Sequence, residues 1–286
     1  MSTSPQTVPE QALVLEKHED GVATLTLNRP DKLNAWTATM EKEVRASLEE
    51  AERDDDVGVI VLTGAGRGFC AGADMSLLSS VAAEGLPGGE RDAVSRLGGN
   101  SLQREGVPLD FQKKYSYFLG IEKPILAAIN GPAVGLGLVI ALYCDLRLAS
   151  DASRFSTTFA QRGLIAEYGM AWMLPRIVGL PNALDLLFSA RQINAAEALR
   201  LGLVNQVFAQ ENFLDKVHEY AVDLASRVSP RSLRVIKRQV YGAMFQTLAE
   251  SFDLAVEEMV ASLRSEDFKE GVAHFLEKRA PVFKGK

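Results

Sequence analysis

Alternating and continuous runs of apolar residues predict strands separated by helices along the first two thirds of the chain. Over residues 22–27, small or apolar residues alternate with threonines, which is the period of a half-buried strand. Apolar residues at helical spacing then run from Met40 to Ala51, and a continuous apolar run follows over residues 57–62. Continuous apolar strands separated by helices are typical of a parallel sheet covered on its faces. We therefore predict an α/β fold.

The same order recurs further along the chain. An apolar run over residues 125–129 precedes a helix of small residues that reaches Tyr143, and a further strand is predicted over residues 146–149. Asn194 can cap another helix, which Gly202 ends before a strand over residues 203–208. This repetition indicates a ladder of strands and helices.

The last quarter of the chain predicts helices only, so we divide the chain into a core over residues 1–210 and a C-terminal helical domain over residues 211–286. Helical periodicity covers residues 213–228, 230–249, 252–263 and 268–278. The segment over residues 83–106 is rich in glycine and charge and has no clean period, which predicts a loop near a site.

Composition and charge exclude some classes of protein. The chain has 286 residues, with 31 Lys and Arg against 37 Asp and Glu, so its net charge of −6 offers no basic surface for nucleic acid or an anionic membrane. No apolar run approaches the roughly 20 residues needed to span a bilayer, and residues 1–11 lack the features of a signal peptide. We expect a cytoplasmic protein.

The cysteines and histidines predict neither a disulfide framework nor a metal site. Cys70 and Cys144 each lie in an apolar stretch, which is typical of buried free thiols. His18, His218 and His274 are far apart in the sequence and have no partner at metal-ligand spacing. We expect no metal and treat these histidines as solvated or core residues.

Two familiar motifs are incomplete. Residues 64–68 follow a predicted strand as a dinucleotide-binding loop would, but Phe69 occupies the sixth position and no acidic residue ends a following strand. The chain also lacks a Gly-x-Ser-x-Gly nucleophile elbow. A nucleotide-binding loop and a serine hydrolase of that type are therefore not favoured.

Two glycine-rich segments remain, over residues 69–74 and 130–137. Each places backbone N–H groups where a strand ends and a helix begins, with little side chain in the way. Two such donors aimed at one point would form an oxyanion hole. The same spacing also fits two tight turns, and the pattern alone leaves both interpretations open.

At these segments the sequence resembles the crotonase superfamily, which is the enoyl-CoA hydratase and isomerase family. The similarity extends over almost the whole chain, through residues 27–30, 34–35, 59–64, 69–74, 123–124, 130–137, 144–145, 155, 174–176, 179, 198–204 and 275–279. The resemblance implies a crotonase (ClpP-like) fold of stacked β-β-α turns with a C-terminal helical domain that forms trimers or hexamers. It also implies an acyl-CoA thioester substrate and a setting in fatty acid metabolism such as β-oxidation. No separate cofactor is implied, because coenzyme A is part of the substrate.

The resemblance assigns several residues to the site. The backbone N–H groups of Ala73 and Leu136 would form the oxyanion hole around the thioester carbonyl. Ala71 and Asp74 would lie along the path of the adenine and pantetheine, and Lys32 would lie near the CoA phosphates.

Other matching positions concern assembly and proton transfer. Phe275 and Lys278 match positions where the last helix of a neighbouring subunit touches the nucleotide. Hydratases of this family use two glutamates, and the corresponding positions here hold Val139 and Phe159. Glu167 instead matches the single catalytic glutamate of peroxisomal-type Δ3,Δ2-enoyl-CoA isomerases, where dienoyl-CoA isomerases and haloaroyl-CoA dehalogenases have an aspartate.

Moving a double bond needs fewer acidic groups than adding water. One carboxylate can take a proton from C2 of a 3-enoyl thioester and return it at C4, while the oxyanion hole stabilises the dienolate. Ile165, Tyr168 and Trp172 flank Glu167 in the sequence and are expected to desolvate it partly, which would raise its affinity for a proton.

The sequence thus predicts an enoyl-CoA isomerase, with three alternatives. The protein could be an enoyl-CoA hydratase that uses Glu167 alone, or a protein that binds CoA thioesters without turnover. Glu167 could also be a surface loop residue with no catalytic role.

Overall fold

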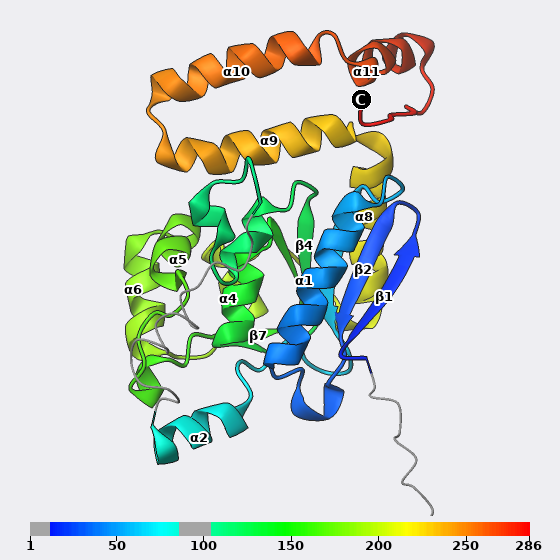
Figure 1. Ribbon diagram of the computed structural model, residues 1–286. Coiled ribbons are helices and arrows are strands. Elements are labelled where there is room, and N and C mark those ends of the chain that lie inside the picture. The colour runs from blue at the N-terminus through cyan, green and yellow to red at the C-terminus, as the bar shows by residue number, and fades with distance from the viewer. Residues whose placement is uncertain (1–11, 86–103) are drawn as a thin grey trace, which may run out of the picture.

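The computed structural model describes residues 12–85 and 104–286 (Figure 1). Within these residues, six strands form the larger sheet in the order β1-β2-β3-β4-β6-β9. They are β1 (Val14–Glu19), β2 (Val22–Leu27), β3 (Val59–Gly64), β4 (Ile125–Ile129), β6 (Leu146–Ser150) and β9 (Gln206–Phe208). The neighbours from β2 to β9 are parallel, as predicted, while β1 is an antiparallel edge strand. Most of the loop predicted over residues 83–106 lies outside the described residues.

Helices cover both faces of this sheet. Successive side chains of a strand point to opposite faces, so Leu25 of β2 joins the core beneath α1 (Ala38–Arg53) and Val22 faces the other side. The apolar stripe of α1 that the sequence predicts, including Met40 and Leu48, is fully buried. On the opposite face, α8 (Phe213–Arg227) buries Phe213, Val217 and Ala221. The division of the chain at residue 210 stays a prediction.

A smaller sheet beside α4 completes the core. Among the described residues it contains β5 (Ala133–Val134), β7 (Arg154–Ser156) and β8 (Ile193–Asn194), in the order β5-β7-β8. All residues of α4 (Leu136–Tyr143) are buried, because the helix runs between the sheet and its covering helices. Because every side of this helix is buried, its sequence shows no alternation between an apolar and a polar face.

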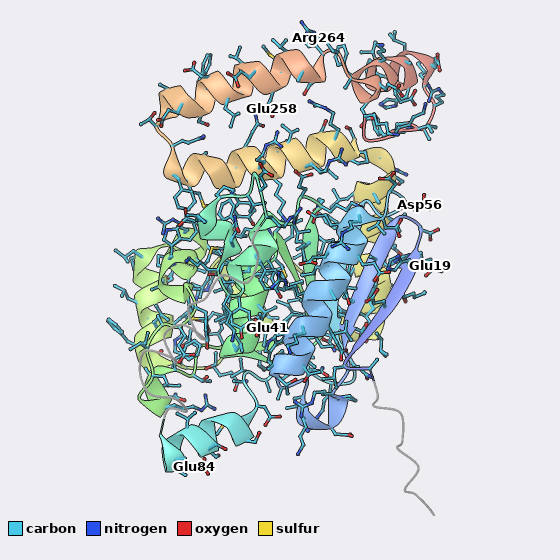
Figure 2. All side chains as sticks on the ribbon, viewed as in Figure 1. Glu19, Glu41, Asp56, Glu84, Glu258 and Arg264 are labelled. Carbon is cyan, nitrogen blue, oxygen red and sulfur yellow. The ribbon has the colours of Figure 1, made fainter. Side chains whose placement is uncertain are left out.

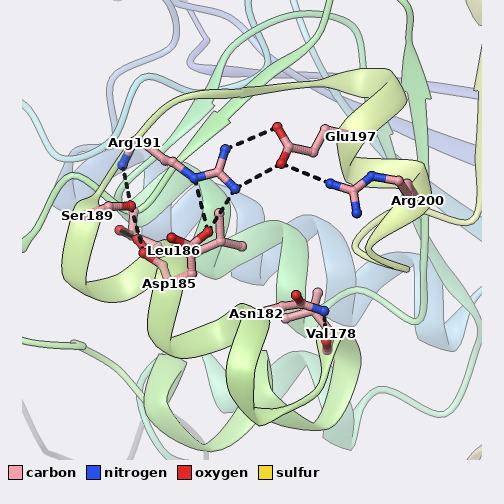
Figure 3. A network of polar contacts seen from close by, with 9 residues as sticks. Val178, Asn182, Asp185, Leu186, Ser189, Arg191, Glu197 and Arg200 are labelled. Carbon is pink, nitrogen blue, oxygen red and sulfur yellow. Dashed lines mark hydrogen bonds and ion pairs between the residues drawn. The ribbon is translucent and has the colours of Figure 1, made fainter.

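Three further helices follow in the core: α5 (Met170–Val178) packs against α4 and α6 (Leu180–Ser189), and α7 (Ala195–Arg200) packs against β7 and β8 of the smaller sheet. Asn194 caps α7 by accepting a hydrogen bond from the Glu197 N–H at 2.9 Å, as predicted. The Arg191 guanidinium lies between Asp185 and Glu197 and so links α6 to α7 across the chain turn (Figure 3). Arg191 is the main reason that the pKa of Glu197 is lowered.

The C-terminal helices extend away from the sheet. They are α9 (Pro230–Gly242), α10 (Leu248–Ser262) and α11 (Glu266–Glu277), and α10 lies on the side of α9 that faces away from the core (Figure 1). Glu258 points from α10 toward α9, where it pairs with Arg231 and Arg238 (Figure 2). Lys237 anchors α9 to the core through an ion pair with Asp145, with 2.8 Å between Nζ and Oδ2.

The remaining described helices are short. They are α2 (Met75–Glu84) and the 3-10 turns η1 (Pro30–Lys32), η2 (Leu109–Gln112), η3 (Ser116–Gly120), η4 (Ala160–Arg162), η5 (Gln210–Asn212) and η6 (Ala243–Phe245). No helix in the described part of the chain is long and apolar enough to cross a membrane.

Three predicted boundaries are wrong, since the helix predicted from residue 252 also begins earlier, at Leu248. The strand predicted over residues 203–208 is confined to residues 206–208, because the N–H groups of Leu203 and Val204 both donate to the Ala198 carbonyl in the turn that ends α7. The helix predicted over residues 230–249 ends at Gly242. Thr247 and Glu250 form a capping box that starts α10, and this local hydrogen bonding overrides the helical periodicity.

Candidate active site

The two glycine-rich segments lie side by side. The Cys70 N–H donates to the Pro132 carbonyl, and the Val134 N–H donates to the Cys70 carbonyl, each at 3.0 Å. A Cβ on Gly137 would lie only 2.1 Å from the Cys70 carbonyl oxygen, so the start of α4 requires glycine to approach this strand. The pairing brings together the two segments that the sequence singled out.

This pairing leaves two N–H donors available. The bridge between Trp36 and Ala73 uses the flanking backbone groups of Gly72 and Asp74, so the N–H of Ala73 itself points away from Trp36. Leu136 is the first residue of α4, where an N–H has no carbonyl within the helix. Among the described residues, neither N–H has a hydrogen-bond acceptor. This arrangement fits an oxyanion hole, and that role for Ala73 and Leu136 stays a prediction.

Two buried asparagines hold the loop that precedes the first turn. Within residues 64–68, Gly68 accepts a hydrogen bond from Asn34 Nδ2 at 2.7 Å, and Gly64 accepts one from Asn130 Nδ2 at 2.8 Å. Both asparagines belong to segments that carry the family resemblance, although no sequence pattern predicts this supporting role for them. Their contacts fix the loop from two sides.

Asp74 is fixed by its own contacts. Its carboxylate caps α2 by accepting the Ser76 N–H at 3.0 Å and pairs with Arg29 at 2.9 Å. The hydrogen bonds from Ser76, followed by that from Arg29, lower the pKa of this carboxyl. Asp74 therefore stabilises the chain next to Ala73, and its predicted contact with CoA stays a prediction.

Lys32 and Ala71 lie near the same turn. Lys32 is exposed in η1, and Ala71 is half-buried with its N–H donated to the carbonyl of Leu33 at 2.9 Å. Leu33, the residue after Lys32, is thus hydrogen-bonded to the glycine-rich segment over residues 69–74. Their roles in CoA binding stay predictions.

Glu167 is half-buried at a constrained turn before α5. Tyr168 and Gly169 have φ values of +48° and +76°, and Tyr143 Oη donates to the Tyr168 carbonyl at 2.8 Å. The helix that begins at Leu136 therefore also fixes, at its far end, the turn that carries Glu167. Sequence reasoning did not identify Tyr143, because no local pattern connects it to residue 168.

The environment of Glu167 favours its protonated form. Burial raises the pKa of this carboxyl, which agrees with the expected direction, and no described residue pairs with or hydrogen-bonds to its side chain. Tyr168 and Trp172 are partly buried and pack against the core. Ile165 does not, because it is 75% exposed and gives little cover within one chain. The catalytic role of Glu167 stays a prediction.

The positions that hold glutamates in hydratases are apolar and buried. Val139 is fully buried in α4, and Phe159 is 6% exposed. The Phe159 ring lies 4.0 Å from the position that a Cβ on Gly135 would occupy, one residue before Leu136. Two hydrophobic side chains thus lie close to the start of α4.

Phe275 and Lys278 are not part of this site within one chain. Both are exposed, Phe275 to 77%, at the end of α11. Figure 1 shows α11 and α2 at opposite ends of the molecule, and α2 begins directly after Asp74. The predicted contact of these two residues with a neighbour's nucleotide stays a prediction.

The other titratable side chains offer little further chemistry. Cys70 and Cys144 are fully buried, as expected, and burial raises the pKa of each thiol to about 12. The described residues contain no group of three or more His, Cys, Asp or Glu side chains that could hold a metal ion.

Comparison with known proteins covers nearly the full chain. The family model for enoyl-CoA hydratase/isomerase matches residues 17–286. The 1,2-epoxyphenylacetyl-CoA isomerase of Escherichia coli strain K12 is 35% identical over 96% of this chain and 98% of its own. A 4-chlorobenzoyl coenzyme A dehalogenase of Arthrobacter sp. is 35% identical over 92% of this chain and 90% of its own.

Solved structures agree with this result. The crystal structure of an enoyl-CoA hydratase from Polaromonas sp. JS666 covers 94% of this chain and 99% of its own, with a TM-score of 0.82 and 27% identity. The expected crotonase fold is thereby confirmed. The chain belongs to the enoyl-CoA hydratase/isomerase family and is an acyl-CoA enzyme of the crotonase superfamily.

Proposed function

We propose that this enzyme shifts a double bond in an enoyl-CoA thioester, with Glu167 as the only carboxylate that moves the proton. The observation that carries the proposal is that Glu167 is half-buried and has no side-chain partner among the described residues, while both positions that hold glutamates in hydratases are apolar and buried. A base that carries a proton between two carbons benefits from a raised pKa, because it must accept and release that proton near neutral pH.

The reaction follows from these groups. Glu167 takes a proton from C2 of a 3-enoyl thioester, and the electron pair of that C–H bond moves into the conjugated dienolate. The N–H groups of Ala73 and Leu136 donate hydrogen bonds to the thioester oxygen as it gains negative charge. Glu167 then returns the proton at C4, which gives the 2-enoyl thioester and restores the carboxylate.

Hydration is the second candidate reaction, and it is less well supported. Adding water requires the water to be held, a proton to be taken from it and a proton to be delivered to carbon. Val139 and Phe159 can do none of these. The relatives named above act on epoxyphenylacetyl-CoA and chlorobenzoyl-CoA, so enzymes similar to this chain are not restricted to hydration.

The test is the variant Glu167→Gln, which keeps the size of the side chain but cannot accept a proton. Isomerisation of 3-enoyl-CoA, followed by NMR in heavy water, should fall by about 10²–10⁴-fold while affinity for a saturated acyl-CoA changes little. The matched control is Glu211→Gln, at an exposed glutamate, which should keep full activity. Rapid hydration of 2-enoyl-CoA that survives Glu167→Gln would contradict the proposal.

We also propose that the chain assembles in multiples of three. α10 has no buried residue in one chain, although Leu248, Phe252, Val256 and Met259 form an apolar stripe along it with exposed fractions from 41% to 87%. Such a surface is typical of an interface between subunits. In the assembly, Phe275 and Lys278 would reach a neighbour's CoA.

Light scattering gives the native mass, which should be a multiple of three chains. Phe252→Arg places a charge on the apolar stripe and should shift the mass toward the monomer and weaken CoA binding. Phe188→Arg changes a phenylalanine on α6 that is 76% exposed, against 65% for Phe252, and should alter neither property. A fully active monomer would refute the proposed assembly.

A further inference from the structure

An aromatic cavity lies next to the proposed site. Its volume is about 330 Å³, and it is lined by five aromatic rings: Phe111, Tyr143, Tyr168, Trp172 and Phe245. An apolar cavity of about 150 Å³ is large enough to hold benzene. The space therefore suits a ring with part of the chain that carries it.

Two chain segments run from the proposed site to the lining of the cavity. Tyr143 ends the helix that begins with the Leu136 N–H, and seven residues of helix span about 10 Å. Tyr168 and Gly169 line the cavity directly after Glu167. A group in this cavity would thus belong to the part of the acyl chain that is remote from the thioester.

The rings in and beside the lining meet one another both face to face and edge to face. Trp172 and Phe245 are stacked at 5.5 Å between ring centres with 13° between their planes. Phe111 meets Phe245 edge to face at 5.9 Å, and Tyr115, just behind the lining, meets Tyr168 in the same way at 4.9 Å. A bound aromatic ring can make further face and edge contacts with these rings, whereas a saturated chain gains only the burial of its apolar surface.

Three of the polar groups around the cavity already have partners. Tyr143 Oη donates to the Tyr168 carbonyl, and Ser116 Oγ donates to the Asp110 carbonyl at 2.6 Å. Lys114 pairs with Glu41 at 3.4 Å. An apolar ring in the cavity would leave these two hydrogen bonds and this ion pair intact.

We propose that this cavity binds an aryl group at the distal end of the acyl chain, and that Trp172 and Phe245 determine this specificity. The proposal rests on the proposed action on CoA thioesters. Phe245 is part of η6, so the segment that leads to the C-terminal helices helps to select the substrate.

The test compares the affinities of two saturated thioesters by calorimetry, so no turnover is required. The ligands are 4-phenylbutanoyl-CoA and 4-cyclohexylbutanoyl-CoA, which have equal carbon counts and differ in the aromatic character of the ring. The phenyl compound should bind about fivefold more tightly to the unmodified protein. Trp172→Leu and Phe245→Leu should each bring the two affinities close together.

The control is Phe188→Leu, which changes an exposed phenylalanine outside the cavity and should keep the preference. Phe245 is 52% exposed, so its variant is expected to fold even if Trp172→Leu does not. Equal affinity for both ligands in the unmodified protein, or a preference that survives Phe245→Leu, would overturn the aryl assignment while acyl-CoA binding still stands. Failure to bind either thioester would overturn the proposed function as well.

Discussion

Gly137→Ala tests whether the close contact between the two glycine-rich segments builds the oxyanion hole. The added methyl would lie 2.1 Å from the Cys70 carbonyl oxygen and 2.9 Å from the Cys70 Cβ. Ordinary contact begins at 3.4 Å, so the start of α4 and the segment at Cys70 must separate by about 1.3 Å. Neither side can yield by rotating a flexible side chain, because the main obstacle is backbone.

The separation should lower the catalytic rate strongly and the free energy of unfolding only modestly. Leu136 and Ala73 lie on the two sides of this contact, so their N–H groups would no longer meet at one point. A misplacement of about 1 Å can cost about 10²-fold in rate, and the loss of one oxyanion donor costs about 10²–10³-fold in kcat. Overpacking should destabilise the fold by about 1–3 kcal/mol, less about 0.5–1 kcal/mol because alanine favours the helix more than glycine.

The assay measures kcat for isomerisation together with thermal unfolding. Gly242→Ala is the matched control, because Gly242 is also helical and a Cβ there would meet only Gln246 Oε1 at 4.0 Å. The control should keep its activity and gain slightly in stability. If Gly137→Ala folded and kept full turnover, α4 would not supply an oxyanion donor.

Three further predictions concern carboxylates. Activity should fall on the acid side with an apparent pKa above the ordinary value of a glutamate, since Glu167 must be deprotonated to act and burial raises its pKa. A glutamate whose pKa is raised in the folded state contributes less to the free energy of unfolding at pH 7 than at low pH. Glu167→Gln should therefore be at least as stable as the parent at pH 7, and a lower melting temperature there would refute this reasoning. The double variant Val139→Glu and Phe159→Glu should gain hydration of 2-enoyl-CoA in NMR assays and lose thermal stability, because two carboxylates enter a buried apolar region. Absence of hydration in a folded double variant would show that pocket shape, and not only missing carboxylates, restricts the reaction.

The sequence by itself determined the elements whose pattern is local. The alternation over residues 22–27 and the stripe from Met40 to Ala51 correspond to β2 and α1, because burial of one face imposes a period that can be read from the chain. Strand β1 was not predicted, since five of its six residues are exposed and it belongs to the sheet only by pairing with β2.

The sequence also located the candidate chemistry, through glycine-rich turns and through the residue at position 167. Tertiary structure alone decided how these groups meet. Gly137 lies next to Cys70 across 67 residues of chain, and Tyr143 fixes the turn after Glu167 from the end of another helix. Phe245 reaches the aromatic cavity from the C-terminal segment. These contacts depend on close approach of the backbone and on burial by distant elements, and neither produces a periodic pattern in the sequence. The raised pKa of Glu167 has the same origin, because the burial that produces it is a property of the folded chain.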